Sequence, residues 1–176
     1  MPETDSQPVA APLHIREVTA EDAAAIAEIY NYYIASSIVT FEEQPVSAEV
    51  IEQRIAKVKK AGLPWLVAEE KGELLGYIYA APWHERSAFR FAAEASVYLS
   101  GKAAGKGLGR KLYAALFDEL KETEIRHLMA VIALPNDASV ALHEKLGFKK
   151  VGEIPEIGFK FNHWIAIGYW QLSDFS

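Results

Sequence analysis

The chain has 176 residues and a mass of 19.5 kDa, which is the size of one domain rather than two. Its 51% apolar, 11% aromatic and 24% charged residues are the balance of a globular protein with a real core, which excludes disordered and fibrous classes. Cysteine is absent, so disulfides, thiolate nucleophiles and cysteine-based zinc sites are excluded. A net charge of −6 and a pI near 5.4 argue against binding to nucleic acid.

Residues 1–12 are polar, contain proline and show no periodicity, which predicts a flexible leader before a domain over residues 13–176. This start lacks the basic and apolar segments of a secretory signal, and no apolar run approaches the roughly 20 residues of a membrane-spanning helix. We therefore expect a cytoplasmic protein without a membrane partner.

The first half of the domain predicts one strand followed by two helices. Residues 13–18 favour a strand, and Thr19 then stands where a helix N-cap belongs. Apolar residues at spacings of three and four over 26–34 predict the buried face of the first helix. Ser47 starts a second helix in the same way, and Gly62 ends it.

The second half alternates strands and helices around one sheet, which predicts an α/β fold. Residues 65–70 and 73–81 flank Lys71-Gly72, a connection typical of a tight antiparallel hairpin. A long strand over 89–100 then leads to a glycine-rich turn, and leucines four residues apart predict a helix from Leu108. The remaining expected elements are a strand at 127–134, a helix from Asn136 to Leu146 closed by Gly147, and strands at 149–153 and 165–172.

The turn over residues 101–109 is a candidate anion site. Four of its nine residues are glycine, and it leads into a helix whose N-terminal N–H groups favour phosphate. The surrounding stretch has no Asp or Glu in a chain that is acidic overall. The spacing matches neither the G-x-G-x-x-G nor the G-x-x-x-x-G-K-[ST] phosphate loop, so a flexible turn with solvated lysines is the alternative. The basic residues of this stretch are Lys102, Lys106, Arg110 and Lys111.

Several motifs together resemble the GNAT superfamily of N-acetyltransferases. The segment 97–110, Val-Tyr-Leu-Ser-Gly-Lys-Ala-Ala-Gly-Lys-Gly-Leu-Gly-Arg, resembles its acetyl-CoA pyrophosphate loop, and 136–148 is similar to its second signature. The likeness covers about residues 14–172 and implies a mixed, mostly antiparallel sheet with helices on both faces. Four further segments resemble the branch of this superfamily that acetylates phosphinothricin and methionine sulfoximine. They are Ala81-Pro-Trp83, Glu94-Ala-Ser-Val-Tyr98, Gly158-Phe-Lys160 and Gly168-Tyr-Trp-Gln-Leu172.

The resemblance implies acetyl-CoA as co-substrate and no metal. The backbone of the loop would hold the pyrophosphate, and the N–H groups near Tyr98 and Leu99 would hold the pantetheine arm. Ala104 stands where the family usually carries Arg or Gln, which removes one side-chain contact with the co-substrate. The residues assigned to acetyl-CoA in this way are Val97, Tyr98, Leu99, Gly105, Lys106, Gly107, Leu108, Gly109, Arg110 and Asn136.

Two residues are candidates for proton transfer. Glu94 lies in the largely apolar run 91–97, where burial would raise the pKa of a carboxyl group and suit it to be the general base. A strand carboxylate that points to solvent is the alternative for Glu94. His143 occupies the place in the second signature where many relatives have a tyrosine acid, and histidine can donate a proton near neutral pH. A histidine on a helix face, satisfied by a carbonyl, fits the pattern equally.

The resembled branch implies an amino-acid analogue as acceptor, whose carboxylate calls for a cation in bidentate reach. By this resemblance, Arg86 is expected to anchor the carboxylate, whereas Arg90 fits a solvated loop charge better. Without cysteine to carry an acetyl group, direct attack through a ternary complex is expected. The residues expected to contact the acceptor are Phe41, His84, Arg86 and Phe89.

These features predict an enzyme that moves acetyl from acetyl-CoA to the α-amino group of phosphinothricin, methionine sulfoximine, methionine sulfone or a similar analogue, as in detoxification. Two alternatives stay open: a GNAT enzyme for a polyamine, an aminoglycoside or a protein N-terminus, and a non-catalytic acyl-CoA-binding regulator. Glu94 and His143 argue against the regulator, since binding alone needs neither. The branch also implies a homodimer, and the apolar run Trp164–Leu172 suits either an interface or a central strand.

Overall fold

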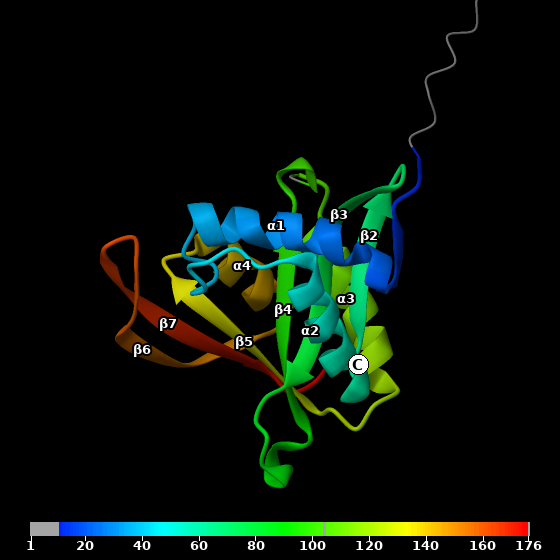
Figure 1. Ribbon diagram of the computed structural model, residues 1–176. Helices are drawn as coiled ribbons and strands as arrows, with labels where there is room; N and C mark the ends of the chain where they lie inside the picture. The colour runs from blue at the N-terminus through cyan, green and yellow to red at the C-terminus, as the bar shows by residue number, and fades with distance from the viewer. Residues whose placement is uncertain (1–10, 104, 176) are drawn as a thin grey trace, which may run out of the picture.

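The computed structural model describes residues 11–103 and 105–175 (Figure 1). Seven strands form one sheet in the order β1-β2-β3-β4-β5-β7-β6. Only the β4–β5 pair is parallel among these neighbours, which confirms the predicted mixed, mostly antiparallel α/β sheet. The strands are β1 (His14–Glu17), β2 (Trp65–Glu70), β3 (Glu73–Pro82), β4 (Ala92–Leu99), β5 (His127–Leu134), β6 (Lys149–Lys160) and β7 (His163–Leu172), and the helices are α1 (Ala23–Ser36), α2 (Ala48–Lys60), α3 (Leu108–Lys121) and α4 (Asp137–Lys145).

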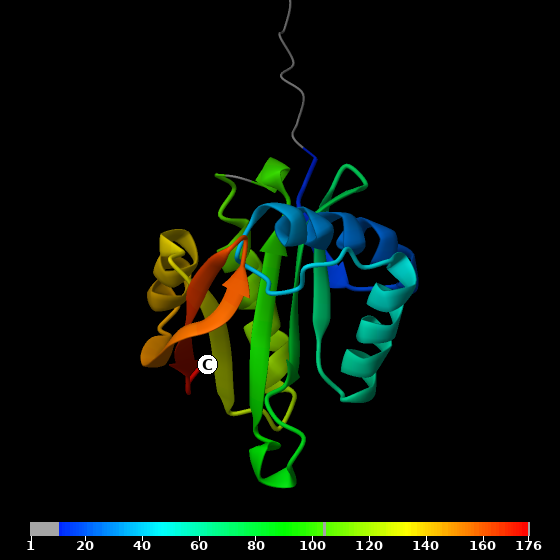
Figure 2. The ribbon, with the colours of Figure 1, turned by 60° about the vertical axis from the view of Figure 1, so that its left-hand side comes forward.

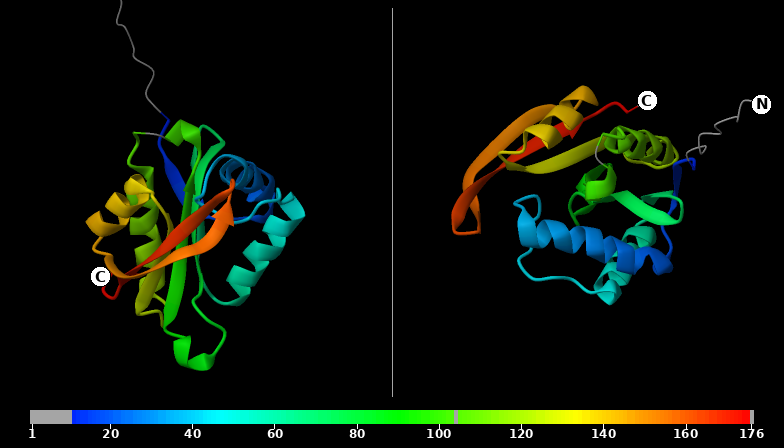
Figure 3. Two further views of the ribbon diagram at one scale, coloured as in Figure 1. Left: turned by 90° about the vertical axis from the view of Figure 1, so that its left-hand side faces the viewer. Right: turned by 90° about the horizontal axis from the view of Figure 1, so that it is seen from above.

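Helices cover both faces of the sheet, as predicted. Seen from above, α1 and α2 lie on one side and α3 and α4 on the other (Figure 3). The leucine stripe of α3 is almost completely buried because each member faces the strands. The stripe consists of Leu108, Leu112, Leu116 and Leu120.

No helix in the described part of the chain is long and apolar enough to cross a membrane.

The N-terminus of α1 is fixed to the edge of the sheet by a polar network. Thr19 caps a short 3₁₀ turn, Ala20–Asp22, and its N–H donates to the Asp22 carboxylate at 2.7 Å. The Arg16 guanidinium on β1 donates to both oxygens of that carboxylate, at 2.8 and 2.9 Å, and reaches Glu69 on β2 at 3.0 Å. These bonds to Arg16 lower the pKa of Asp22, which stays ionised.

Two tight turns set the register of the antiparallel hairpins. Lys71 and Gly72 both have positive φ, at 54° and 76°, as the predicted β2–β3 hairpin requires. Phe161 and Asn162 repeat this conformation between β6 and β7, at 51° and 61°. This second turn was missed because it carries no glycine.

Two predicted strand boundaries are wrong. The strand expected from residue 89 begins only at Ala92, because Ser87–Phe89 forms a 3₁₀ turn in which the Arg90 N–H donates to the Ser87 carbonyl. The strand expected over 149–153 continues to Lys160. It tolerates Pro155 because β6 is an edge strand, and its register shifts between Ile154 and Gly158.

The apolar run Trp164–Leu172 forms most of β7, an inner strand between β5 and β6. The β6–β7 hairpin extends past the helices and forms one side of the molecule (Figure 1). The central-strand alternative for this run is therefore confirmed. The predicted leader, residues 1–12, lies almost wholly outside the described residues.

Candidate active site

Strands β4 and β5 are paired for only a short distance and then separate. Their parallel register covers Ala92, Ala93 and Glu94, after which β4 continues beside β3 and β5 continues beside β7. From residue 95 onward, the edge of β4 that faces β5 has no strand partner in the described chain. A cavity of about 60 Å³ lies in the opening. It is lined by Val39, Ala95, Ser96, Val97, Tyr98, Ala130, Val131, Ile132, Ala133, Asn136, Ser139 and His143.

The glycine-rich turn lies at the C-terminal end of β4. Gly105 and Gly107 adopt positive φ, 75° and 63°, and Gly107 is the N-cap of α3 without a side chain to cap it. The first N–H groups of a helix have no intrahelical acceptor, so this end can receive an anion. Leu108 and Gly109 are buried and can offer only backbone groups. A Cβ on Gly109 would lie 3.0 Å from Leu142, so this glycine also allows α3 and α4 to approach.

The lysines of this turn are ion-paired rather than simply solvated. Lys106 contacts Glu70 at 2.8 Å, and Lys102 pairs with Glu73, so the β2–β3 hairpin supplies the two carboxylates. The proximity of Lys106 lowers the pKa of Glu70. Arg110 in the first turn of α3 is exposed, which makes it the better candidate for a phosphate contact. Ala104 lies outside the described residues.

Asn136 caps α4, as predicted, because its Oδ1 accepts the Ser139 N–H at 3.1 Å. Its side chain lines the cavity together with Ser139 and His143 from the same helix. The structure therefore brings the α4 N-terminus to the strand opening, where two predicted co-substrate residues, Val97 and Tyr98, also lie.

His143 is 4% exposed and both of its ring nitrogens have partners. Nδ1 lies 2.7 Å from the Ser139 carbonyl, which can only accept, so Nδ1 carries the hydrogen. In the neutral ring Nε2 therefore accepts the Tyr113 hydroxyl hydrogen, at 2.6 Å. Burial lowers the pKa of His143. These contacts match the expectation of a histidine satisfied by a carbonyl, although the ring also lines the cavity.

Glu94 lies where β4 and β5 part, and it is half-buried. By the strand alternation its side chain shares a face with Ser96 and Tyr98, and its backbone is in register with Ala81 of β3. Among the described residues, no hydrogen bond or ion pair engages its carboxylate. Burial raises the pKa of Glu94, as the sequence suggested. An acid without a partner beside an open strand edge is suited to exchange protons with a ligand.

The residues expected to bind the acceptor form two groups. Phe41 lies in loop 37–46 between α1 and α2, with its ring packed on Gly158 of β6. His84, Arg86 and Phe89 lie in the exposed loop between β3 and β4, where the His84 and Phe89 rings are 4.9 Å apart. Glu94 is the third residue of β4 and so lies nearer to this loop than to the glycine-rich turn.

Arg90 in the same loop has internal contacts. Its guanidinium donates to the Ser87 carbonyl at 3.1 Å and lies 4.2 Å from the Phe91 ring centroid. Arg90 is exposed, as expected of a loop charge, but its guanidinium is engaged within the loop rather than only solvated. Arg86 is the other cation of this loop.

Sequence reasoning missed three residues that matter here. Ser139 precedes His143 by four residues, so the two lie one helical turn apart. This spacing could have predicted their hydrogen bond. Tyr113 comes from another helix, and Val39 from a loop, so only the tertiary fold brings them to the site. No group of three or more His, Asp or Glu side chains able to hold a metal occurs in the part of the chain that is described.

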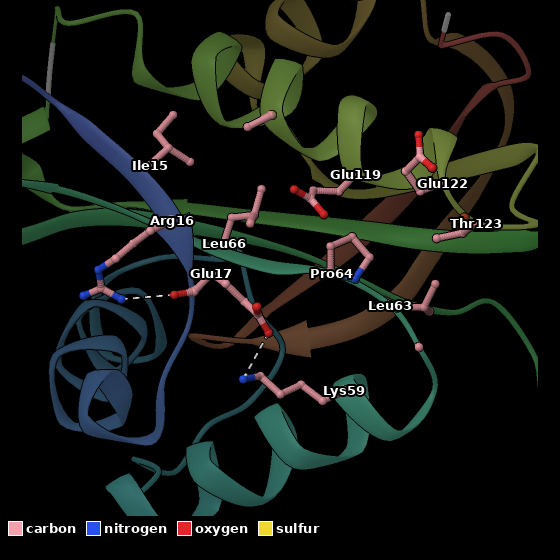
Figure 4. Close-up of a pocket in the computed structure, with 12 residues that line it drawn as sticks. Ile15, Arg16, Glu17, Lys59, Leu63, Pro64, Leu66, Glu119, Glu122 and Thr123 are labelled. Atoms are coloured by element: carbon pink, nitrogen blue, oxygen red, sulfur yellow. Dashed lines mark hydrogen bonds and ion pairs between the residues drawn. The ribbon is translucent and has the colours of Figure 1, made fainter.

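A larger cavity, of about 500 Å³, lies elsewhere, between β1, the end of α2 and the last turn of α3 (Figure 4). Glu119 and Glu122 point into it, and Lys59 on its opposite wall is paired with Glu17 at 3.2 Å. None of the predicted site residues lines it. Its size alone therefore does not mark it as the active site.

The neutral state of His143 predicts a pH dependence of stability. Its folded pKa is below the ordinary 6.5, so the unfolded chain binds more protons as the pH falls through that value. The free energy of unfolding, measured by urea denaturation between about pH 7.5 and about pH 5.5, should therefore decrease toward acid, and His143→Gln should flatten this dependence. The exposed His163→Gln is the control. A charged His143 ring in an NMR titration at pH 7 would contradict the assignment.

Comparisons with known proteins agree with this geometry. The family model described as acetyltransferase (GNAT) domain matches residues 15–167. The phosphinothricin N-acetyltransferase of Streptomyces viridochromogenes is 38% identical over 91% of this chain and 87% of its own. The L-methionine sulfoximine/L-methionine sulfone acetyltransferase of Salmonella typhimurium is 35% identical over 90% and 92%. A phosphinothricin acetyltransferase structure from Sinorhizobium meliloti, in complex with acetyl-CoA, superposes with a TM-score of 0.87 at 35% identity, covering 91% of this chain and 87% of that one. The chain therefore belongs to the GNAT acetyltransferase family and is related to its phosphinothricin and methionine sulfoximine acetyltransferases.

Proposed function

We propose that this acetyltransferase acts on the α-amino group of a small amino-acid analogue such as phosphinothricin, methionine sulfoximine or methionine sulfone, with a role in detoxification. The names of the relatives support this substrate class. The observation that carries the mechanism is Glu94, a half-buried carboxylate at the point where β4 leaves β5, with no hydrogen-bond or ion-pair partner in the described part of the chain. A regulator that only binds acyl-CoA has no use for such a group.

Acetyl-CoA fits the opening between β4 and β5. The free backbone edge of β4 around residues 95–98 offers N–H and C=O groups to the amides of a pantetheine arm, much as an added strand would pair. The glycine-rich turn and the bare N-terminus of α3 offer N–H groups to the pyrophosphate. Asn136 and Val97 line the cavity between these two features.

Acetyl transfer then needs two protons removed from the ammonium nitrogen and one supplied to the CoA sulfur. Glu94 takes a proton from the acceptor ammonium, directly or through water, so that the nitrogen lone pair can attack the thioester carbonyl carbon. The C–N bond forms, the C–S bond breaks, and the CoA thiolate leaves with its electron pair. The nitrogen then loses its second proton, which reaches the thiolate directly or through water. A base for the first step must be ionised, and the raised pKa of Glu94 places it closer to the pH of the reaction.

His143 could supply the proton that the CoA sulfur receives only after its ring has gained a second hydrogen. In its neutral state the Nδ1 hydrogen is donated to Ser139 and Nε2 accepts from Tyr113. We therefore propose that the main role of His143 is structural, as part of the cavity wall. Acid catalysis by His143 is the second candidate role. Loss of Glu94 is the sharper test of the mechanism.

Replacing Glu94 with Gln keeps the shape of the side chain and removes the base. We expect kcat to fall by roughly 10²–10⁴-fold, with partial recovery at high pH, where free amine is more abundant. In the unaltered enzyme, kcat/KM should decline toward acid with an apparent pKa above the ordinary 4.5, because burial raises the pKa of Glu94. The rate of CoA-thiol release across a pH series measures both the kcat of Glu94→Gln and the pH dependence of kcat/KM in the unaltered enzyme.

The control for this change is Glu124→Gln, an exposed glutamate remote from β4 along the chain, which should leave kcat unchanged. Calorimetry should give Glu94→Gln the same acetyl-CoA affinity as the unaltered protein, since the co-substrate site is elsewhere on β4. Full turnover by Glu94→Gln at neutral pH would refute the base assignment.

A panel of amines tests the substrate class. Phosphinothricin, methionine sulfoximine and methionine sulfone should be acetylated in preference to spermidine, an aminoglycoside and a peptide N-terminus, because Arg86 anchors a carboxylate. Arg86→Ala should raise KM for the carboxylate-bearing amines by roughly 10-fold or more, with little change in kcat, since the ion pair is present in both ground and transition state. Lys57→Ala, which removes an exposed cation from α2, is the control. A preference for an amine without a carboxylate would support the other-amine alternative instead.

We also propose that the protein is a homodimer, with a second copy covering the β6–β7 hairpin. Six large apolar side chains are 40–64% exposed there, which is more apolar surface than isolated exposed residues explain. Five of them lie on the edge strand or its turn, so the interface would use β6 rather than the inner strand β7. They are Val151, Ile154, Ile157, Phe159, Phe161 and Trp164.

Light scattering at micromolar concentration should therefore give twice the 19.5 kDa chain mass. The double change Phe159→Glu with Trp164→Glu should shift the protein toward monomer, because burying two new carboxylates opposes association. Tyr32→Ser removes an equally exposed ring from α1 and should leave the mass unchanged. A monomer mass for the unaltered chain would disprove the dimer.

A further inference from the structure

Loop 37–46, between α1 and α2, contributes to two walls of the site. Val39 lines the cavity between β4 and β5, opposite residues of both strands. Phe41 packs its ring on Gly158 of β6, where an added Cβ would lie 2.2 Å from the ring. The loop therefore joins the strand opening to the β6–β7 hairpin, and its position decides the shape of the space between them.

Lys160, the last residue of β6, holds the first part of this loop. Its side chain is buried, with 3% of the residue exposed, and its Nζ donates to the carbonyls of Ser37 and Thr40, each at 2.8 Å. Figure 2 shows the tip of the β6–β7 hairpin beside the chain that leaves α1. No ion pair within the described residues joins Lys160 to a carboxylate. A buried ammonium of this kind is tolerated only because its hydrogen bonds are made.

Thr40 and the second part of the loop are also held by side chains of α1 and α2. The Thr40 hydroxyl shares a hydrogen bond with Tyr30 at 2.7 Å. The Glu42 carboxylate accepts from Arg54 of α2, at 2.9 Å for one of the two bonds. The Val46 backbone is bonded in both directions by the Asn31 amide, at 2.8 and 2.9 Å. These contacts lead to α1 and α2, so the hydrogen bonds of Lys160 are what attach the loop to the sheet.

We propose that Lys160 is a positioning residue, which holds loop 37–46 against the β6–β7 hairpin and thereby keeps Phe41 as a fixed wall of the acceptor cleft. This inference rests on the proposed function, because it assigns the wall to the amine side of the reaction. The glycine-rich turn has no part in the attachment. Loss of the attachment should therefore change acceptor binding more than acetyl-CoA binding, although Val39 of the same loop lines the cavity between β4 and β5.

Lys160→Met tests this directly, since Met keeps the apolar stem and removes the three N–H donors. We expect KM for the acceptor amine to rise roughly 10- to 100-fold, the range typical of lost hydrogen bonds to a charged group, with smaller changes in kcat and in the acetyl-CoA affinity measured by calorimetry. Lys160→Arg, which can donate to both carbonyls, should recover part of the loss. Lys149→Met, an exposed lysine on the same strand, is the matched control and should have no effect.

Hydrogen exchange gives a readout that does not depend on activity. The Val39 and Glu42 amides donate to side chains within the loop, at 3.2 Å each, and should exchange faster in Lys160→Met. The Val46 amide, held by Asn31, should keep its protection and serves as an internal reference. Unchanged exchange at Val39 and Glu42 in the folded variant would overturn the proposal, as would parallel losses of kcat and acetyl-CoA affinity.

A second variant moves Phe41 without touching Lys160. Gly158→Ala should displace the Phe41 ring and raise KM for the amine while Val39 exchange stays as in the unaltered chain. An unchanged KM in this variant would remove Phe41 from the wall. If no amino-acid analogue is acetylated by the unaltered protein but exchange still rises in Lys160→Met, the proposed function fails and the attachment of the loop stands.

Discussion

The separation of β4 from β5 after Glu94 is the constraint on which the site depends. Each strand has a second neighbour, β3 or β7, that continues to pair with it, so the sheet survives although one parallel ladder stops. The interruption leaves a backbone edge inside the protein instead of at its rim. The glycine-rich turn at the end of β4, the α4 N-cap and the half-buried Glu94 are arranged along this one opening, and the roles that we propose for them depend on that arrangement.

The site also contains three titratable side chains whose pKa values move in the direction that favours the neutral form. Burial raises the pKa of Glu94 and lowers those of His143 and Lys160. Within residues 11–103 and 105–175, only His143 and Lys160 have their hydrogen bonds made by the protein itself. This contrast separates a group that is free for chemistry from groups that organise the fold around it.

The sequence predicted the α/β class, all four helices and most strands, because helical stripes and tight turns are local signals. It was less reliable where local rules conflict with the fold. The second part of β6 was not predicted, because it contains Pro155 and ends in a turn without glycine. The sheet tolerates this proline because β6 is an edge strand. Within the site, Glu94 and Asn136 followed from local pattern and resemblance. Val39, Tyr113 and the ion pairs of the loop lysines did not, since each depends on contacts between segments far apart in the chain.

The interrupted ladder has a consequence for the protein before any ligand arrives. An unpaired strand edge is a template for strands of other chains, and proteins usually protect such edges to avoid aggregation. Here the free edge of β4 lies in a cavity of about 60 Å³, flanked by β5 and covered in part by Val39. The residues of β5 and Val39 that line this cavity stand where a strand of another chain would have to pair, so the fold shields the edge from misassembly although the β4–β5 ladder is interrupted.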